Sequence, residues 1–279
     1  MMLIADSGST KTDWRGVDSN QKITSFETIG FNPYHISEKE ILAELSSSKL
    51  TIIKLEVKQV VFYGAGCSSL EKSNEIKLAL QQFFTNAKVE VNHDLLAAAR
   101  ALCGHEKGMV GILGTGSNTC LFDGENIVKN VSSLGYILGD EGSGSYIGKT
   151  FITALFNNEL SQEVVQKYQQ QFKYNLNDVL DAVYKKPLPN RFLAQFAPFV
   201  FEQKSMPEIA SIIDVCFTAF FEKHICKYEN YQQYPLNIVG SVGFIFKDEI
   251  EKVAARYRVK LGKVIKQPIE ELVRFHTKH

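Results

Sequence analysis

A succession of elements that occurs twice, about a hundred residues apart, limits the possible fold more than any other feature of the chain. In each copy a short apolar strand runs into a polar glycine-containing loop, a second strand follows, and a tight turn leads to a third strand. The predicted strands are 3–5, 11–17 and 22–28 in the first copy, and 109–113, 119–122 and 127–128 in the second. This repetition predicts two related α/β domains with a cleft between them, each contributing one glycine loop.

The rest of the chain supplies helices and further short strands. Ser37 followed by Glu40 is a capping box that opens a helix over 37–50. Further helices are predicted at 73–85, 95–102, 247–257 and 268–276, a helical layer at 148–234, and strands at 59–63, 88–92, 236–239 and 259–265. We place the domains at 1–106 and 107–279, and note that the last helix is able to pack back on the first domain.

The composition excludes several classes of function. At 279 residues the chain is long enough for two cores, and its 31 basic and 31 acidic residues give no net charge that would attract nucleic acid or an anionic membrane. No apolar run is long enough to span a bilayer, and a charge follows too soon after Met1 for a signal peptide. The five scattered cysteines contain no C-x-x-C pair, so we expect reduced thiols in a cytoplasmic protein.

The first polar loop, Asp6–Thr12, suits a nucleotide. A turn of small residues lets backbone N–H groups converge on phosphate oxygens, hydroxyls add donors, and Lys11 adds charge. A carboxylate at the end of a strand, here Asp6, is able to hold Mg²⁺ through water. The candidate phosphate-binding residues are Ser7, Gly8, Ser9, Thr10, Lys11 and Thr12. The competing interpretation is a hairpin built from favoured turn residues.

Two more glycine-rich segments follow. The second loop, with candidates Gly114, Thr115, Gly116 and Ser117, has neither the ending of a Walker A loop nor a Rossmann fingerprint. The stretch 135–148 sets two adjacent acids, Asp140 and Glu141, among five glycines. Such a segment is too polar to bury without partners, so it predicts a ligand-facing loop that opens a helix near Ser143.

Asp94 ends a strand just before an alanine-rich helix, and two interpretations stay open for it. It is placed to accept the proton of a hydroxyl that attacks a γ-phosphate. Alternatively it caps the helix, which is a favoured position for aspartate and the interpretation that the spacing alone favours.

These segments in this order resemble the BadF/BadG/BcrA/BcrD ATPase family of the sugar kinase/actin/heat-shock chaperone superfamily, in its N-acetylglucosamine kinase-like branch. Asp6–Thr12 is similar to the phosphate-1 motif, Gly114–Ser117 to phosphate-2 and Gly240-Ser241-Val242 to the adenosine motif, while Gly139–Gly144 resembles a family signature. The resemblance implies two actin-like ATPase (ribonuclease H-like) domains of the α/β class, with ATP as the phosphate donor and Mg²⁺ as the metal.

The resemblance also implies a role for particular residues. Asp94 would be the catalytic base, Asp6 would organise Mg²⁺, and Gly240 and Ser241 would contact the nucleotide. The implied sugar-binding residues are Asn32, Asp94, Thr115, Gly116, Gly135, Asp140, Ser143 and Gly144. The implied activity is phosphorylation of an N-acetylated amino sugar, N-acetylglucosamine above all, at the 6-hydroxyl, by a homodimer.

Leu134 stands where many relatives have a tryptophan near the sugar, so N-acetylmuramic acid is an alternative substrate. Two classes of protein that are not sugar kinases share the same fold. A dehydratase activator would need cysteines near Asp140, whereas none lies between Cys120 and Cys216. A sugar-sensing regulator usually has a DNA-binding helical domain in front, whereas the first strand here begins at Leu3.

Overall fold

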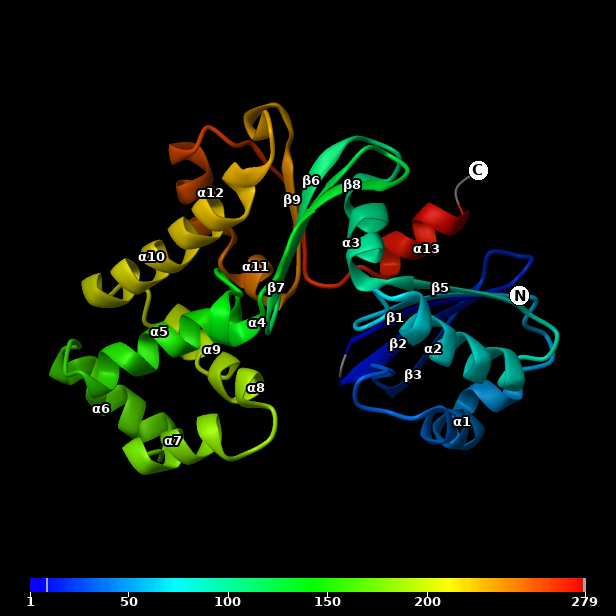
Figure 1. The fold of residues 1–279 in the computed structure, drawn as a ribbon, viewed down its shortest axis with the longest axis horizontal. Coiled ribbons are helices and arrows are strands. Elements are labelled where there is room, and N and C mark those ends of the chain that lie inside the picture. Colours follow the sequence, from blue (N-terminus) through cyan, green and yellow to red (C-terminus); the bar gives the residue numbers. More distant parts are fainter. Residues whose placement is uncertain (9, 278–279) are drawn as a thin grey trace. The chain divides into compact units, whose positions relative to one another are not determined.

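The computed structural model describes residues 1–8 and 10–277. The chain forms two compact units, of which unit 1 comprises residues 1–105 together with 267–279, and unit 2 comprises residues 106–266. The division proposed from the sequence assigned everything beyond residue 106 to the second domain and left the last helix open. In the structure the last helix, α13 (Ile269–Thr277), packs on the helix α3 (Asp94–Cys103) and on the first two strands of unit 1 (Figure 1).

Unit 1 is a five-stranded mixed sheet with the order β3-β2-β1-β4-β5. Its strands are β1 (Met2–Ser7), β2 (Lys11–Val17), β3 (Ile23–Ile29), β4 (Gln59–Gly64) and β5 (Lys88–His93). β1 pairs with β2 antiparallel and with β4 parallel, and its residues Leu3, Ile4 and Ala5 are fully buried. A continuous apolar run is what a strand covered on both faces requires, which is why the chain places β1 at the centre.

The helical elements of unit 1 within residues 1–105 each begin where a polar side chain caps them. Together with α13, they are α1 (Glu38–Ser47), the 3₁₀ turn η1 (Lys49–Ile52), α2 (Leu70–Phe83) and α3. The capping box of Ser37 and Glu40 is confirmed. The predicted start of α2 at residue 73 was wrong: Ser69 caps the helix by accepting from Lys72 N, and the exposed Leu70 hides the first turn from an apolar pattern.

The core of unit 1 is centred on Trp14, which is fully buried on β2. Its ring lies near those of Phe31, Phe62 and Phe84, with centroids 6.1, 5.8 and 6.5 Å away. The indole Nε1 donates to Thr28 Oγ1 at 2.9 Å, so the one polar atom of the side chain is satisfied. Burial of aromatic side chains therefore fixes the sheet from which the first loop projects.

Unit 2 repeats the arrangement with the strand order β10-β9-β6-β7-β8. Its strands are β6 (Gly108–Leu113), β7 (Ser117–Phe122), β8 (Ile127–Val131), β9 (Leu236–Val239) and β10 (Leu261–Ile265). The central strand β6 pairs with β7 antiparallel and with β9 parallel, as β1 does with β2 and β4. The two-domain α/β fold of the actin-like ATPases is thus confirmed.

The predicted helical layer of unit 2 is present between β8 and β9. Its elements are α4 (Gly135–Leu138), α5 (Gly144–Phe156), α6 (Gln162–Gln171), α7 (Leu176–Tyr184), α8 (Pro189–Ala194), α9 (Ala197–Glu202), α10 (Pro207–Lys223), η2 (Ile225–Lys227) and η3 (Tyr231–Gln233). After β9 come α11 (Ser241–Ile245) and α12 (Lys247–Arg256). Aromatic rings of α5, α6, α9 and α10 fill the core beneath this layer.

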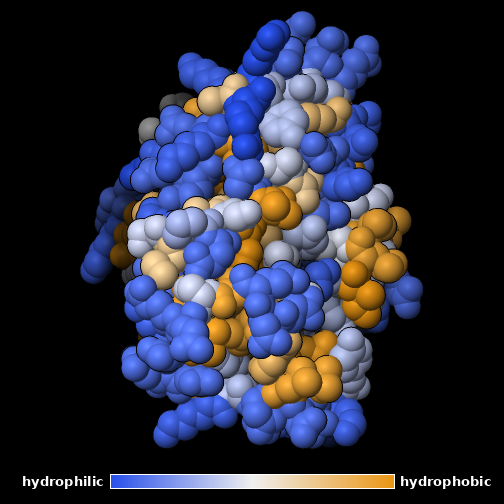
Figure 2. Space-filling model, turned by 90° about the vertical axis from the view of Figure 1, so that its left-hand side faces the viewer, coloured by the Kyte–Doolittle hydropathy of each residue, from blue (hydrophilic) through white to orange (hydrophobic). Residues whose placement is uncertain are grey.

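The outer helices of unit 2 leave apolar side chains at the surface. In the lower half of the face shown in Figure 2, apolar residues lie among hydrophilic ones. Exposed Leu176, Leu180 and Tyr184 on α7 belong to this layer, and they line a mainly apolar cavity of about 430 Å³. Within the described residues, no helix is both long enough and apolar enough to cross a membrane.

The place of α13 can be tested through Trp14, the only tryptophan of the chain. Leu272 of α13 is fully buried, and Leu272→Ala should destabilise unit 1 by about 2–5 kcal/mol because it leaves a cavity. We expect the midpoint of urea unfolding, followed by tryptophan fluorescence, to fall.

Ile250→Ala is the matched control, since Ile250 is fully buried on α12 of unit 2. It should lower the far-ultraviolet dichroism midpoint more than the fluorescence midpoint. An unchanged fluorescence midpoint in Leu272→Ala would contradict the packing of α13 in unit 1.

Candidate active site

The first loop of unit 1 connects β1 to β2 by a tight turn in which Gly8 N donates to Lys11 O at 3.0 Å. The hydroxyls of Ser7 and Thr12 lie 2.8 Å apart and are both buried. Thr12 Oγ1 donates to Ile29 O, and Ser7 Oγ accepts from Phe31 N. These two hydroxyls therefore hold the loop to β3 and to the residue two positions after it. A phosphate group at this loop would be left with the backbone N–H groups and the exposed Thr10 as donors. Ser9 lies outside the described residues.

Lys11 projects from the same loop but faces two carboxylates. Its Nζ lies 3.1 Å from Asp13 and 3.0 Å from Glu27, and hydrogen bonds to Glu27 and then Asp13 raise the pKa of the ammonium group. The side chain is 43% exposed, so these ion pairs are weak and can be exchanged. A phosphate group would have to compete with both acids for this cation.

Asp94 is the first residue of α3, and it does not cap the helix. The cap is His93, whose Nδ1 accepts from Leu96 N at 3.3 Å. The interpretation of Asp94 as the N-cap was therefore wrong. Asp94 Oδ1 accepts from the backbone N–H of Leu95 at 2.8 Å, which orients the carboxylate at the start of the helix.

Asp6, at the end of β1, and Asp94 influence each other electrostatically. Burial, together with the negative charges of Asp94 and Asp13, raises the pKa of Asp6 to about 7, and the positive charge of Lys11 only partly opposes this rise. Burial likewise raises the pKa of Asp94 to about 6. Each residue keeps some exposed surface, yet enough protein surrounds each carboxyl group to disfavour its ionised form.

Asp6 and Asp94 are suited to a magnesium site that phosphate and water complete, and less suited to a site in which the protein supplies every ligand. Among the described residues no group of three or more His, Cys, Asp and Glu side chains lies close enough to hold a metal. Mg²⁺ is commonly bound by one or two carboxylates, with phosphate oxygens and water completing its octahedron. A divalent cation would also remove the repulsion that raises the pKa of Asp6.

Asn32 follows β3 in unit 1 and is 8% exposed. Its Oδ1 accepts from Tyr34 N at 3.0 Å, which closes a local turn. Gly66 lies so near that a Cβ there would be 2.5 Å from this Oδ1, and its φ of +83° favours glycine as well. The turn around Asn32 is thus fixed by local contacts.

In unit 2 the second loop is joined to the start of α5 by backbone hydrogen bonds. Gly144 N donates to Gly114 O at 2.8 Å, and Ser145 N donates to Thr115 O at 3.0 Å. Ser143 caps α5 by accepting from Tyr146 N, as predicted for a helix opening near that residue. The phosphate-2 loop and the signature segment therefore form one rigid element.

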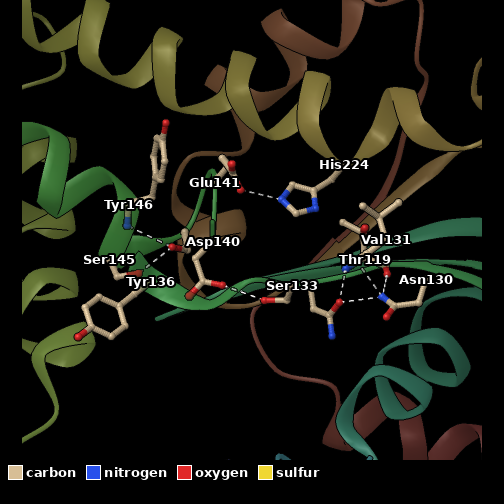
Figure 3. A network of polar contacts seen from close by, with 12 residues as sticks. Thr119, Asn130, Val131, Ser133, Tyr136, Asp140, Glu141, Ser145, Tyr146 and His224 are labelled. Carbon is tan, nitrogen blue, oxygen red and sulfur yellow. Dashed lines mark hydrogen bonds and ion pairs between the residues drawn. The ribbon is translucent and has the colours of Figure 1, made fainter. Parts of the chain in front are cut away.

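Asp140 lies at the centre of this element (Figure 3). Its carboxylate accepts from Ser133 Oγ at 3.0 Å and from the backbone N–H of Ser117, and a Cβ on Gly116 would be 2.9 Å from its Oδ2. Burial raises the pKa of Asp140, and these two hydrogen bonds oppose the rise. The side chain is held against the second loop. Ser133 was missed by the sequence analysis, because nothing in the sequence distinguishes it from the neighbouring Ser132.

The buried hydroxyl Ser117 Oγ has no hydrogen-bond partner among the described residues. Such an atom costs free energy unless a ligand or water satisfies it. The backbone N–H of the same residue donates to Asp140, so the hydroxyl adds a further donor at the end of the second loop.

The predicted adenosine motif places Gly240 at the end of β9 and Ser241 at the start of α11. A Cβ on Gly240 would be 2.2 Å from Leu113 O, and its φ is +126°, so only glycine fits. Gly135 opens α4 with a φ of +73°. None of the predicted site residues is among those that line the apolar cavity of about 430 Å³, which is therefore a separate feature of unit 2.

No protein-family model and no curated protein matches the chain. Among solved structures, a protein from Porphyromonas gingivalis, provisionally named an N-acetylglucosamine kinase, is 39% identical with a TM-score of 0.94, over 99% of this chain and 98% of that one. A provisionally named N-acetylglucosamine kinase from Chromobacterium violaceum is 16% identical with a TM-score of 0.60, over 98% of both chains. A ROK family glucokinase from Streptomyces griseus, in complex with glucose and AMPPNP, is 15% identical with a TM-score of 0.57, over 98% and 97%.

The last two similarities show the fold, and the first, over nearly the whole of both chains, shows the family. The two-unit fold and its loops define an ATP-dependent sugar kinase of the sugar kinase/actin superfamily. Within that class the chain belongs to the BadF/BadG/BcrA/BcrD ATPase family, in the branch of the N-acetylglucosamine kinase-like proteins.

The raised pKa of Asp6 predicts a dependence of stability on pH. Because the folded-state pKa of about 7 lies above that of the unfolded chain, the folded state binds the proton more tightly, and stability is lost as pH rises toward 7. Asp6→Asn removes this loss. In calorimetry it should melt above the wild type at pH 8, by ~2–4 °C for each kcal/mol gained. The difference should shrink as pH falls and disappear below the unfolded-state pKa of 3.8.

Asp123→Asn serves as the control, since backbone hydrogen bonds from Asn126 and Glu125 lower the pKa of Asp123. That variant should show no gain at pH 8. If Asp6→Asn melts below the wild type at pH 8, the account of its electrostatics is wrong.

Proposed function

We propose that this kinase phosphorylates an N-acetylated amino sugar, with N-acetylglucosamine as the preferred substrate and the 6-hydroxyl as the acceptor. The observation that carries the proposal is the 39% identity, over nearly the whole of both chains, to a protein provisionally named an N-acetylglucosamine kinase. The carboxylates Asp94 and Asp140 supply the two kinds of contact that such a reaction needs, a proton acceptor and a hydroxyl-binding group.

Asp94 is proposed as the general base. The hydroxyl oxygen of the sugar forms a bond to the γ-phosphorus of ATP, the bond from that phosphorus to the bridging oxygen breaks, and ADP leaves with the electron pair. The hydroxyl proton passes to the Asp94 carboxylate. A pKa of about 6, raised by burial, suits a group that must be ionised at neutral pH and still accept a proton.

The remaining groups bind and orient. Asp140 and Asn32 are proposed to hold sugar hydroxyls, assisted by Gly135, Ser143 and Gly144, while Thr115 and Gly116 contact sugar or phosphate. The first loop, the second loop and the motif at Gly240 and Ser241 are proposed to bind ATP through backbone N–H groups. Mg²⁺ near Asp6 would neutralise phosphate charge when bound, and Lys11 would exchange an acidic partner for a phosphate.

Substrate choice can be tested in a coupled assay of ADP release. N-acetylglucosamine should give the highest kcat/KM among N-acetylglucosamine, N-acetylmuramic acid, N-acetylmannosamine, glucosamine and glucose, and the rate should require both sugar and Mg²⁺. N-acetylmuramic acid is the second candidate, because Leu134, which is 60% exposed, stands where many relatives have a tryptophan. ADP release at the same rate without any sugar would contradict the kinase assignment.

The role of Asp94 can be separated from that of Asp140 by matched substitutions. Asp94→Asn keeps the shape of the side chain and leaves the cap at His93 in place, so the fold should be retained. Loss of a general base should lower kcat by roughly 10²–10⁴-fold while sugar affinity changes little. Asp140→Asn should mainly raise KM for the sugar, because its hydrogen bonds act in the ground state as well.

A fully active Asp94→Asn enzyme would overturn the catalytic assignment and leave Asp140 as the next candidate. Calorimetry of sugar binding to Asp94→Asn provides the control, since intact binding excludes misfolding as the cause of inactivity.

The cellular location and the oligomeric state of the enzyme are also proposals. A cytoplasmic location is supported by the five scattered cysteines, which contain no C-x-x-C pair. A homodimer is the expectation of the family and can be checked by sedimentation. An iron–sulfur dehydratase activator is disfavoured, because no cysteine lies between Cys120 and Cys216.

A further inference from the structure

A buried histidine contacts the residue that follows Asp140. His224, at the end of α10, places its Nε2 3.0 Å from Glu141 Oε2 (Figure 3). The side chains of His224 and Glu141 are 4% and 15% exposed, so the contact is shielded from water. A hydrogen bond from an imidazole to a carboxylate in such surroundings is stronger than one at the surface.

The next residue, Gly142, packs on the same helix. A Cβ there would lie 2.8 Å from Phe220 Cβ, and the φ of Gly142 is +75°. The ring of Phe220 in turn lies 5.7 Å from that of His224. The C-terminal end of α10 therefore contacts two consecutive residues of the signature segment. His224 forms a hydrogen bond with Glu141, and Phe220 packs closely on Gly142.

These contacts lie next to Asp140 in the chain. Asp140 has a φ of +58°, a left-handed conformation that non-glycine residues rarely adopt, and Ser143 N donates to its carbonyl oxygen at 3.0 Å. Such a conformation persists only where the surroundings hold it. The carboxylate is fixed by Ser133 and Ser117 on one side, and the backbone is fixed through Glu141 on the other.

The other nitrogen of His224 shows that the residue is not a simple core residue. When Nε2 donates to Glu141, Nδ1 carries a lone pair, and this buried atom has no hydrogen-bond partner among the described residues. A leucine in that position would avoid the cost of burying an unpaired polar atom. What the histidine provides and leucine would not is the bond to Glu141.

We propose that His224 is a positioning residue for the sugar-binding carboxylate: through Glu141 it holds Asp140 in the conformation that binds hydroxyls. This inference rests on the proposed role of Asp140 in sugar binding. His224 itself lies on the far side of Glu141 from Asp140 in Figure 3, so it acts by orienting the loop.

The experiment compares His224→Leu with His224→Gln. The leucine variant removes the donor, whereas the glutamine amide can still donate to Glu141 from near the Nε2 position. In calorimetric titrations with N-acetylglucosamine, and in steady-state kinetics, His224→Leu should weaken sugar affinity and raise the sugar KM by ~10-fold, the size of an ordinary coupling between contacting residues. Its kcat should stay within about 3-fold of wild type, and His224→Gln should restore most of the affinity.

Phe221→Leu is the control for a loss of packing. Phe221 is fully buried on the same helix, where it stacks on Tyr257, and no hydrogen bond or ion pair of Glu141 among the described residues involves it. This variant should lower the melting temperature without changing the sugar KM. The double variant His224→Leu with Glu141→Ala should be no weaker in sugar binding than the worse single variant, because both changes remove one bond.

Amide hydrogen exchange over residues 139–145 separates this inference from the proposed function. Faster exchange in His224→Leu than in His224→Gln or Phe221→Leu would support the loop contact, whichever sugar the enzyme binds. Failure of the wild type to bind any of the sugars tested would instead reject the proposed substrate. Unchanged exchange, or an unchanged sugar KM in a wild type that binds sugar, would overturn the role of His224.

Discussion

The burial of carboxyl groups without a directly bonded cation is the constraint on which the site depends. Asp6, Asp94 and Asp140 each lie in surroundings that raise their pKa, and within the described residues none of the three has an ion-pair partner. Ionised carboxylates so placed cost free energy, and the surrounding fold must supply it. In the roles proposed for these residues, a cation, a sugar hydroxyl or a transferred proton would relieve that cost, so the same feature that weakens the free protein would favour its ligands.

The two sheets place their loops in the same way. In each unit a central strand pairs antiparallel with the strand that follows it and parallel with a later one. The functional loop therefore occupies the tight connection beside a fully buried strand, where the backbone cannot shift without disturbing the core. In unit 1 the hydroxyls of Ser7 and Thr12 hold the loop, and in unit 2 the backbone of α5 does so.

The helices make the glycine-rich signature segment rigid. Phosphate or sugar contacts on a glycine-rich segment demand rigidity from residues that are intrinsically mobile, since glycine loses the most conformational freedom on ordering. The signature segment obtains this rigidity from three sides: the cap of α5 at Ser143, the carbonyl groups of the second loop, and the end of α10 at Phe220 and His224. A segment whose composition is typical of a flexible loop is thus held by contacts on three sides.

Local sequence was sufficient to predict the repeated strand pattern, the capping box at Ser37 and Glu40, the two glycine loops and the helix that opens at Ser143, because these depend on residues close together in the chain. It could not distinguish His93 from Asp94 as the cap of α3, since both side chains can accept from the first turn. Tertiary packing alone placed α13 in unit 1, and it alone brought Ser133 to Asp140 and His224 to Glu141. Glu141 and His224 are 83 positions apart, and Arg15 and Glu270, which form an ion pair, are 255 apart. Such contacts arise from burial and packing, and local periodicity contains no record of them.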